Sequence, residues 1–426
     1  MTTSEFIAQN RLLNPRDLAL QSRRYPDVDM AYALNQIQGW QTARRKLPSW
    51  AECDGVEYPP HLNMEQCSSE PAARYKQEVA RRWLAATATD PTSPTSMADL
   101  TGGFGVDFSF TSRCFSSATY VERNAALCSV VEANLPHLGI ANARVECTEA
   151  EAWLADATPQ TMLFLDPARR DSNGAKTVFI ADCTPDVLTL LPQLMAKSRF
   201  TMLKLSPMLD WHKAVDDLRG TVAEVHVVSV GGECKELLLV LDASREEGRK
   251  AAVSVHCADI EPKPSADGSY ARSEFAYEWH ATAADAPLPC PSCRQPRYLY
   301  EPNASVMKAG CFGEIARRFG VSAVAPNSHL FLSEERADGF PGRAFAIDAA
   351  TTMNRRQLRQ ALGSAERANI AVRNFPMSAD QLRKRLKLRD GGDTYIFATT
   401  AHDGTHMLYI AHKPEDGAEE RSDCRK

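Results

Sequence analysis

The sequence predicts an α/β protein with a doubly wound, mostly parallel sheet, preceded by helices and followed by small α+β domains. Two observations support this prediction. Between residues 96 and 245, short apolar runs of strand length alternate with longer segments of helical periodicity. A glycine-containing turn, TGGFG, follows the first of those runs, as expected where a strand passes into a helix. The chain of 426 residues also exceeds one ordinary hydrophobic core, so several domains are expected.

The composition is that of a soluble globular protein rather than a membrane or secreted one. Hydrophobic residues make up 44% of the chain and charged residues 24%. No apolar run approaches the length of a membrane span, and MTTSEFIAQN lacks the pattern of a signal peptide. The 12 cysteines lack the spacing of a disulfide framework, which indicates reduced thiols. We therefore expect a cytoplasmic protein without membrane contacts.

Changes in periodicity and in proline, serine and glycine content divide the chain into predicted domains. A helical region is expected at 1–95, ending in the linker TATDPTSPTS. The sheet domain follows at 96–245. The remaining expected segments are an α+β domain at 250–350, a smaller α+β domain at 354–414 and a polar, disordered tail at 415–426.

The N-terminal region carries apolar residues at helical spacing, and its last helix has a clear start. In Ser68-Ser69-Glu70-Pro71, a hydroxyl residue stands at the expected cap and proline in the first turn. Gln66 and Ser68 belong to a stretch that is dense in short polar groups just before this helix. By itself this pattern indicates only a capped surface helix.

The strands of the sheet domain are predicted from the alternating pattern. They are expected at 97–100, 118–122, 143–147, 161–165 and 200–205, followed by two closely spaced strands at 222–230 and 236–241. The short connection between the last two indicates an antiparallel hairpin. Its connection, Gly231 to Glu236, is either a charged hairpin turn or a polar group that faces a ligand, and both interpretations stay open.

The turn after the first strand predicts a nucleoside-binding site. Gly103 and Gly105 allow a tight turn and a close approach of the backbone to a ligand. Glu122 ends the second strand, where a carboxylate can accept hydrogen bonds from ribose hydroxyls. Phe108 replaces the third glycine of a dinucleotide fingerprint, and Asp107 places negative charge where pyrophosphate would bind. A ligand with ribose and a cation but no phosphate suits this turn better; an ordinary βα turn is the alternative.

This stretch resembles motif I of class I S-adenosylmethionine-dependent methyltransferases, whose catalytic domain is Rossmann-like. The resemblance implies that S-adenosylmethionine is the cofactor. The residues that would hold it along the sheet are Asp99, Thr101, Gly103, Gly105, Glu122 and Glu149. Gln66 and Ser68 would close over its methionine end, because a segment of this kind precedes motif I in nucleic-acid methyltransferases of this class.

Asp166 and Pro167 follow the fourth strand and are predicted to form the acceptor side of the site. Ligands of an open α/β sheet bind at the carboxyl ends of its strands, so Asp166 is expected to point toward the glycine turn. Its carboxylate can hold an exocyclic amine or a water, although a helix cap is the alternative. Pro167 stiffens the turn, and Arg169 can hold a phosphate or stack on a base. D-P-A-R matches motif IV in position but lacks its second proline and its aromatic residue.

A cysteine nucleophile is not expected. The D-P-A-R form resembles the uracil-C5 RNA methyltransferases, which need a thiolate after the fifth strand. That place reads Lys204-Leu205-Ser206-Pro207, and Cys183 falls at an expected helix start. Methyl transfer to a nitrogen or an oxygen, assisted by positioning and electrostatics, is therefore favoured.

The segment after the sheet domain is predicted to contain strands and one clear helix. Pro296 to Asn303 is strand-like, and Ala304 to Phe319 reads as one amphipathic helix that ends at Gly320. Cys290 and Cys293 form a lone C-x-x-C, and no further cysteine or histidine lies at a standard spacing for zinc. No metal site is expected.

The last domain is predicted to be basic. Residues 354–413 carry 11 Lys and Arg against 5 Asp and Glu, a charge of +6 that leaves −11 for the rest of the chain. The helix SADQLRKRLKL places Leu382, Leu386 and Leu388 inward. Its surface residues, which are the predicted nucleic-acid contacts, are Arg383, Lys384, Arg385 and Lys387.

EQCSSEPAARYK, DPARR, YLYEPNASVMKAG and this ending together resemble bacterial methyltransferases with a ferredoxin-like domain and a C-terminal THUMP-like domain. The resemblance implies methylation of RNA, either rRNA or tRNA, and assigns 250–350 as ferredoxin-like and 354–414 as THUMP-like. The residues that map directly onto family motifs are Gln66, Ser68, Asp166, Pro167 and Arg169. Two alternatives remain: a methyltransferase that acts on a protein or small molecule, and a non-catalytic module that binds S-adenosylmethionine and RNA.

Overall fold

The computed structural model describes residues 1–88, 90, 92–169, 179–246, 248, 251–280 and 295–414. The predicted tail at 415–426 and the pair Cys290 and Cys293 fall outside the described residues, as does the side chain of Arg169. The chain forms two compact units. The first comprises Met1–Arg272 and Glu278–Ala281, and the second comprises Ser273–Tyr277 and Thr282–Lys426.

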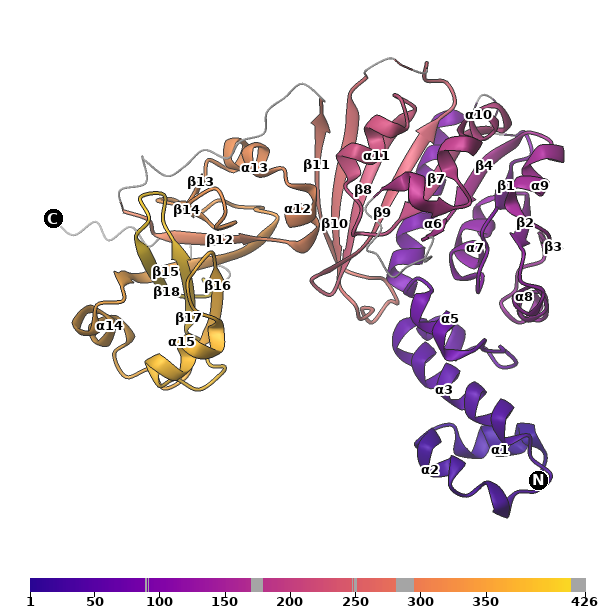
Figure 1. Cartoon of the computed structure of the whole chain (residues 1–426), viewed down its shortest axis with the longest axis horizontal. Coiled ribbons are helices and arrows are strands. Elements are labelled where there is room, and N and C mark those ends of the chain that lie inside the picture. Colours follow the sequence, from indigo (N-terminus) through magenta and orange to yellow (C-terminus); the bar gives the residue numbers. More distant parts are fainter. Residues whose placement is uncertain are drawn as a thin grey trace. The chain divides into compact units, whose positions relative to one another are not determined.

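The first unit begins with helices (Figure 1). They are α1 (Thr3–Asn10), α2 (Pro15–Ala19), the 3₁₀ turn η1 (Ser22–Arg24), α3 (Met30–Lys46), α4 (Pro48–Ala51), α5 (His61–Gln66) and α6 (Glu70–Thr87). Ser69 occupies the cap position of α6, and Pro71 lies in its first turn. The predicted hydroxyl cap is wrong in its chemistry, because the Ser69 hydroxyl makes no capping hydrogen bond and is buried without a partner among the described residues.

The first unit contains a sheet with the order β10-β8-β9-β7-β4-β1-β2-β3. Its strands are β1 (Ser96–Asp99), β2 (Ser117–Glu122), β3 (Ala143–Cys147), β4 (Gln160–Leu165), β7 (Ser198–Leu205), β8 (Val222–Val230), β9 (Glu233–Asp242) and β10 (Val253–Ile260). The strands from β3 to β7 are parallel, and β9 runs antiparallel to both β7 and β8. This confirms the predicted α/β sheet with an antiparallel end. The strand order reverses between β1 and β4, which is where such a sheet forms a ligand crevice.

Short helices connect the strands of this sheet. They are α7 (Val106–Thr111), η2 (Ser112–Cys114), α8 (Ala125–His137), α9 (Ala150–Asp156), η3 (Ile180–Asp182), α10 (Val187–Lys197) and α11 (Trp211–Asp217). Cys183 does not start a helix as predicted. It lies in the short strand β6 (Cys183–Thr184), because it pairs with Arg169 of β5 (Ala168–Arg169). Strand β9 also begins earlier than predicted, since Glu233 pairs with Val230.

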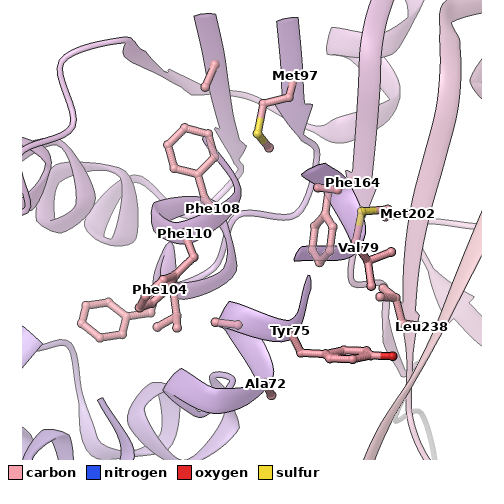
Figure 2. Packing of buried hydrophobic residues seen from close by; sticks show 14 of the residues in the cluster. Ala72, Tyr75, Val79, Met97, Phe104, Phe108, Phe110, Phe164, Met202 and Leu238 are labelled. Atoms are coloured by element: carbon pink, nitrogen blue, oxygen red, sulfur yellow. The ribbon is translucent and has the colours of Figure 1, made fainter. Parts of the chain in front are cut away.

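Helix α6 is held against the sheet by buried apolar side chains. Figure 2 shows Tyr75 and Val79 of α6 beside Phe164, Met202 and Leu238 of the sheet, and all of these residues belong to one buried cluster. Burying each such side chain stabilises the fold by roughly 1.5–3 kcal/mol. The segment from α5 to α6 is thereby fixed against the sheet domain.

The second unit contains a sheet with the order β13-β14-β12-β15-β18-β17-β16. Its strands are β12 (Tyr298–Pro302), β13 (Ser322–Ala323), β14 (Phe331–Ser333), β15 (Gly342–Thr352), β16 (Asn369–Arg373), β17 (Tyr395–Thr400) and β18 (His406–His412). The boundary between the units falls within β11 (Arg272–Trp279). None of the described helices in either unit is long and apolar enough to span a bilayer.

The single helix predicted at Ala304–Phe319 is wrong. The structure contains α12 (Ala304–Ala309) and α13 (Phe312–Phe319), because Gly310 adopts a left-handed φ of 73° and ends the first helix. Helix α13 ends at Gly320, as the sequence predicts.

Two further helices, α14 (Arg355–Leu362) and α15 (Ala379–Leu386), share one apolar cluster with the second sheet. Leu358 of α14 and Leu382 of α15 are buried in it, and Leu388 is buried as well. Both helices therefore cover the same face of the sheet. Leu386 is only partly buried, since Lys387 has a left-handed φ and ends α15.

Candidate functional site

A cavity of about 290 Å³ lies at the carboxyl ends of β1, β2 and β4, where the strand order reverses. Its walls contain most of the site residues predicted from the sequence. These are Gln66, Ser68, Asp99, Thr101, Gly103, Gly105, Glu122, Glu149 and Asp166. Further lining residues, which were not among the predicted site residues, include Asn63, Cys67, Asp107, Arg123, Glu151 and Lys204. The fold therefore brings segments from residue 63 to residue 204 to one pocket.

The turn between β1 and α7 is tied to the strands on both sides. The N–H of Leu100 donates to the carbonyl of Phe164, and the N–H of Gly102 donates to that of Val121, each at 2.9 Å. A Cβ on Gly102 would lie 2.1 Å from the Tyr120 ring, so this position accepts no side chain. Gly105 adopts φ 78°, a left-handed conformation that glycine reaches without strain.

Glu122 is fixed by the backbone at the end of β2. Its Oε2 accepts a hydrogen bond from the N–H of Gly103 at 3.0 Å, and its Oε1 accepts one from the N–H of Asn124 at 2.8 Å. Each carboxylate oxygen has further lone pairs. The carboxylate is therefore a pre-positioned acceptor at the wall of the pocket.

Asp99 and Thr101 bind the turn itself. Oδ1 of Asp99 accepts from the N–H of Thr101 at 3.0 Å, and Oγ1 of Thr101 accepts from the N–H of Asp166 at 2.6 Å. Burial raises the pKa of Asp99 well above its ordinary value, which favours the neutral acid. These two side chains hold the ends of β1 and β4 together beneath the pocket.

Glu149 and Gln66 line the pocket from opposite segments. Glu149 stands at the cap position of α9, is exposed and lies 4.0 Å from a guanidinium nitrogen of Arg123. Gln66 ends α5 and is exposed. Both side chains are exposed rather than packed in the core, so both can turn toward a ligand.

Cys67 adds a thiol to the pocket that the sequence reasoning missed. Its Sγ donates to the carbonyl of Met64 at 3.3 Å. Burial raises the pKa of Cys67 to about 11, with Lys46 opposing the shift. At neutral pH the group is therefore a thiol rather than a nucleophilic thiolate.

Ser68 belongs to a buried network of charges behind the pocket. Its Oγ donates to Oδ2 of Asp107 at 2.8 Å and accepts from Nζ of Lys76 at 3.2 Å. The fully buried Lys76 also pairs with Oδ1 of Asp107 at 3.2 Å and with Glu236. Burial by itself raises the pKa of Asp107, but Lys76 and Lys204 outweigh it and lower that pKa below its ordinary value. Ser68 therefore lines the pocket and also holds the neighbouring lining residue Asp107 in place.

The connection between β8 and β9 is a hairpin turn. Gly231 and Gly232 have positive φ and form its hairpin turn, and the exposed pair Glu233 and Lys235 bind each other at 2.6 Å. Glu236 is buried and faces Lys76, and burial raises its pKa. None of these residues lines the pocket among the described residues.

Asp166 lies at the end of β4 and is paired with a residue that the sequence reasoning did not select. Its Oδ2 accepts from Nζ of Lys204, near the end of β7. Lys204 also lies 3.6 Å from Oδ2 of Asp107. The side chain of Asp166 is 39% exposed and that of Lys204 is 12% exposed. A lysine near the carboxyl end of the fifth strand was visible in the sequence, but its partner was not.

Glu224, His226 and His256 form a second cluster, outside the pocket. Strand pairing sets His256 beside His226, and their rings stack at 4.6 Å. His226 contacts Glu224 at 3.0 Å and the hydroxyl of Tyr75 at 2.9 Å. The three ligand atoms lie within 4.8 Å of one another, a spacing that a metal ion could use. The hydrogen bonds already satisfy His226 without one.

The predicted nucleic-acid contacts lie on α15 and at its C-terminal cap, and they differ in whether an acidic residue pairs with them. Arg383 pairs with Asp380 at 2.7 Å and with Asp390 at 2.6 Å. Lys384, Arg385 and Lys387 are exposed and make no ion pair with any described residue. The sequence reasoning missed a second set of exposed arginines, on α14, which consists of Arg355, Arg356 and Arg359.

Two family models match the second unit. A ferredoxin-like domain matches residues 298–341, and a THUMP domain-like family matches residues 342–413. Over nearly its whole length the chain is similar to a solved protein described as a "putative methyltransferase", from Porphyromonas gingivalis W83. The TM-score is 0.80 at 29% identity, over 97% of this chain and 98% of that one.

Other solved structures match only part of the chain. A SAM-dependent methyltransferase from Agrobacterium tumefaciens has a TM-score of 0.31 at 14% identity, over 48% of this chain and 62% of that one. An rRNA methylase from Streptococcus thermophilus has a TM-score of 0.30 at 14% identity, over 41% of this chain and 98% of that one. Scores this low support no inference about function. No curated protein matches the chain. The matches confirm the predicted resemblance, a class I methyltransferase fold followed by ferredoxin-like and THUMP-like domains.

Proposed function

We propose that the chain is a cytoplasmic S-adenosylmethionine-dependent methyltransferase that methylates a nitrogen or an oxygen of RNA, either rRNA or tRNA. We assign 1–95 as its helical region and 96–245 as the methyltransferase domain, with a ferredoxin-like domain within 250–350 and a THUMP-like domain over 354–414; β10, at the start of the third range, belongs to the first sheet, and the THUMP-like match begins at residue 342. The observation that carries the proposal is the acidic pocket at the switch point of the sheet, with Glu122 fixed against the glycine turn.

The charge of the pocket supports a cationic nucleoside rather than a dinucleotide. Its acidic residues are Asp99, Asp107, Glu122, Glu149, Glu151 and Asp166, against the cations Arg123 and Lys204. Even with Asp99 neutral, the walls attract a sulfonium and an ammonium group and repel a pyrophosphate. The donor set therefore fits S-adenosylmethionine, which supplies an electrophilic methyl group when bound.

Each predicted cofactor residue has a distinct proposed role. Glu122 accepts hydrogen bonds from the ribose hydroxyls, and Glu149 lies near the adenine. Gly103 and Gly105 let the ligand approach the backbone, while Asp99 and Thr101 fix the turn. Gln66 contacts the methionine end, and Ser68 supports that wall through Asp107.

Asp166, Pro167 and Arg169 are proposed for the acceptor side. Asp166 stands at the pocket wall with its backbone N–H bonded to Thr101. Pro167 is buried and stiffens the turn. A covalent mechanism through the pocket thiol is disfavoured, because the raised pKa of Cys67 keeps the sulfur protonated.

The exposed cations of the THUMP-like domain support RNA as the substrate. Lys384 and Arg385 of α15, and Lys387 at its C-terminal cap, belong to a helix that covers the same sheet face as α14 with its arginines. Unpaired cations on one face bind phosphates without reading sequence. Arg383 joins them with part of its charge already neutralised by Asp380 and Asp390.

The proposal is tested in two steps on the full chain. Calorimetry with S-adenosylmethionine measures cofactor binding. Transfer of a tritiated methyl group to bulk RNA, with and without nuclease, then measures activity. Asp166→Ala is expected to abolish transfer while cofactor affinity is retained. Asp217→Ala, which breaks the ion pair with Lys213 on α11, is the matched control and leaves transfer unchanged. Transfer by Asp166→Ala at the wild-type rate contradicts the assigned role.

The same assay separates the alternatives. Label that resists nuclease but is lost with protease, or that enters a small molecule, identifies a different substrate class. Cofactor binding without transfer to any fraction identifies a non-catalytic module. Absence of cofactor binding removes the proposal altogether.

A further inference from the structure

The first helices of the chain carry arginines that the proposed site does not use. Residues 1–46, which form α1 to α3 and are here called the N-terminal arm, carry 7 Lys and Arg against 4 Asp and Glu, a charge of +3 in a chain whose net charge is −5. We propose that this arm is an RNA-binding surface, on which Arg11, Arg44 and Arg45 hold phosphates next to the nucleotide that enters the pocket. This inference rests on the proposed function and adds to it a docking surface in the first unit, apart from α14 and α15 in the second.

The arginines of the arm are exposed and keep their charge. They are Arg11, Arg16, Arg23, Arg24, Arg44 and Arg45, and none of them forms an ion pair with any residue that the structure describes. Exposed arginines elsewhere in the same unit have acidic partners, as Arg82 has Glu224 and Arg144 has Glu146. A guanidinium without a carboxylate partner is free to bind a phosphate through two parallel N–H groups. The charge of this surface therefore complements a phosphate backbone.

Trp40 holds two of these arginines in place. The guanidinium groups of Arg11 and Arg44 lie 4.6 Å and 5.1 Å from the centre of its ring. The ring is itself fixed, because its Nε1 donates to the carbonyl of Ala51 at 3.1 Å. The backbone of Arg11 is tied to the same helix, since Nε2 of Gln41 donates to its carbonyl at 2.9 Å. A guanidinium that already lies over an aromatic ring loses less conformational freedom when it binds a ligand. Two different helices thus present a pre-oriented pair of cations.

The basic end of α3 lies beside one wall of the pocket. Nζ of Lys46, in the last turn of α3, donates to the carbonyls of Met64 and Glu65 at 2.9 Å and 2.6 Å. Those carbonyls belong to α5, which contributes Asn63 and Gln66 to the pocket. The two arginines that precede Lys46 are thereby placed next to the helix that forms this wall.

The base of the arm is packed into the sheet domain. The ring of Trp50, in α4, meets the ring of Phe104 edge-on, with 5.0 Å between their centres, and Phe104 lines the pocket. Leu47 and Trp50 belong to the same buried cluster as α6 and the sheet. A phosphate bound at the end of α3 is therefore held at a fixed place relative to the pocket. Binding energy from such a phosphate can be used to position the reacting nucleotide.

The test uses the full chain and bulk bacterial RNA from cells that lack this protein. One variant combines Arg11→Gln, Arg44→Gln and Arg45→Gln, and a second replaces the same three residues by lysine. Arg45→Gln by itself is compared with Arg199→Gln, the matched control. Arg199 is an exposed arginine near the amino end of β7, away from the carboxyl ends of the strands that form the pocket, and it has no ion pair with a described residue.

Four measurements are made on each variant. Filter binding with S-adenosylhomocysteine bound gives RNA affinity as a function of salt without turnover, and calorimetry gives the affinity for S-adenosylmethionine. Ultraviolet crosslinking followed by peptide mass spectrometry locates the bound RNA. Thermal unfolding checks the fold, because cations in the last turn of α3 also stabilise that helix.

The glutamine variant is expected to bind RNA about tenfold or more weakly, with the affinity for S-adenosylmethionine unchanged. The slope of log affinity against log salt concentration should fall by about 2, which is about 0.7 for each of three phosphates. Arg45→Gln should lower the slope by about 0.7, and Arg199→Gln should match the wild type. The lysine variant should keep the slope but recover only part of the affinity, because an ammonium lacks the planar fork. Crosslinked peptides should include Trp40.

The failure of this inference can be told apart from that of the proposed function. A wild-type chain that neither binds nor methylates RNA removes the proposed function, and the inference with it. A wild-type chain that methylates RNA, beside a glutamine variant with unchanged affinity and slope, removes the inference alone and leaves the arm for a protein partner. Equal effects of Arg45→Gln and Arg199→Gln also overturn it, since the charge would then act without regard to place. If the glutamine variant does not fold, Arg45→Gln and the crosslinked peptides decide, and crosslinks confined to 354–413 count against the arm.

Discussion

The side chains of the pocket owe their chemistry to partners on other segments of the chain. Cys67 shows this most directly, since the same residue on a surface would be a reactive thiol. Here its Sγ donates to the carbonyl of Met64, and the side chain is buried near Lys46. Burial raises the pKa of Cys67 by more than Lys46 lowers it, so the pKa is about 11. The raised pKa keeps this thiol protonated and therefore poorly reactive at neutral pH.

Slow alkylation of Cys67 is therefore expected. At pH 8, a thiol with a pKa of about 11 is ionised in roughly one molecule in a thousand. Iodoacetamide should modify the exposed Cys147 well before Cys67, as followed by peptide mass spectrometry. The rate at Cys67 should rise about tenfold for each pH unit up to the limit of protein stability. Equal rates at the two residues at pH 8 would contradict the raised pKa.

At the scale of elements, the stability of strand β8 and its neighbours is predicted to depend on pH through Glu224. Burial by itself raises the pKa of Glu224, but His226, Trp83 and Arg82 lower it from 4.5 to about 2. A carboxyl whose folded pKa is lowered stabilises the fold above its unfolded pKa, and this contribution is lost as the pH falls through the folded value. The relevant window is therefore from pH 4.5 down to about 2, and the contribution above it is about 3 kcal/mol.

Glu224→Gln tests this contribution. Urea unfolding should show the variant less stable than the wild type at pH 7, and the difference should shrink as the pH falls below 4.5. Glu132→Gln, on the exposed side of α8, should show a small difference that does not change over the same range. A difference for Glu224→Gln that stays constant from about pH 7 to about pH 3 would show that its ionisation does not contribute.

The basic residues of α14 and of the α15 segment predict how RNA affinity depends on salt concentration. Replacing Lys384, Arg385 and Lys387 by glutamine should reduce the slope of log affinity for RNA against log salt concentration. The reduction should be about 0.7 for each phosphate of a single strand that the variant no longer neutralises. Filter binding between about 50 and 200 mM salt measures it. The same change of Arg355, Arg356 and Arg359 should act in the same direction.

Arg383→Gln should change this slope less than Lys384→Gln, because Asp380 and Asp390 already neutralise Arg383. Arg317→Gln on α13, where Glu314 pairs with the arginine, is the control and should leave the slope unchanged. If neither triple variant alters the slope, the RNA docks on another surface.

At the scale of the whole molecule, the division into two units predicts two responses to heat. The proposed cofactor pocket lies entirely in the first unit. S-adenosylmethionine at about 100 times its dissociation constant should stabilise that unit by about 2.7 kcal/mol. Scanning calorimetry should show one transition that rises with cofactor and another that does not. A single transition that shifts as a whole would show that the units unfold cooperatively.

The elements were predictable where a local pattern forms them. The apolar runs of the sheet, the glycine turn and the end of α13 at Gly320 follow from periodicity and from turn residues, and the structure confirms them. The single helix expected at 304–319 was wrong, because a continuous amphipathic pattern hid the left-handed Gly310. The hydroxyl cap at Ser69 was wrong because tertiary packing turned the group inward.

The sequence by itself determined where the strands fall along the chain, the turn between β1 and α7, and the acids at the strand ends. These depend on periods of a few residues, and they place Asp99, Glu122 and Asp166 along one edge of a parallel sheet. Only the tertiary structure decided what those acids face. Asp166 meets Lys204, 38 residues away in the chain, and Lys76 meets Glu236 across 160 residues. Partners at such separations are set by how the strands and α6 pack together, and no local pattern in the sequence encodes which charge lies opposite which.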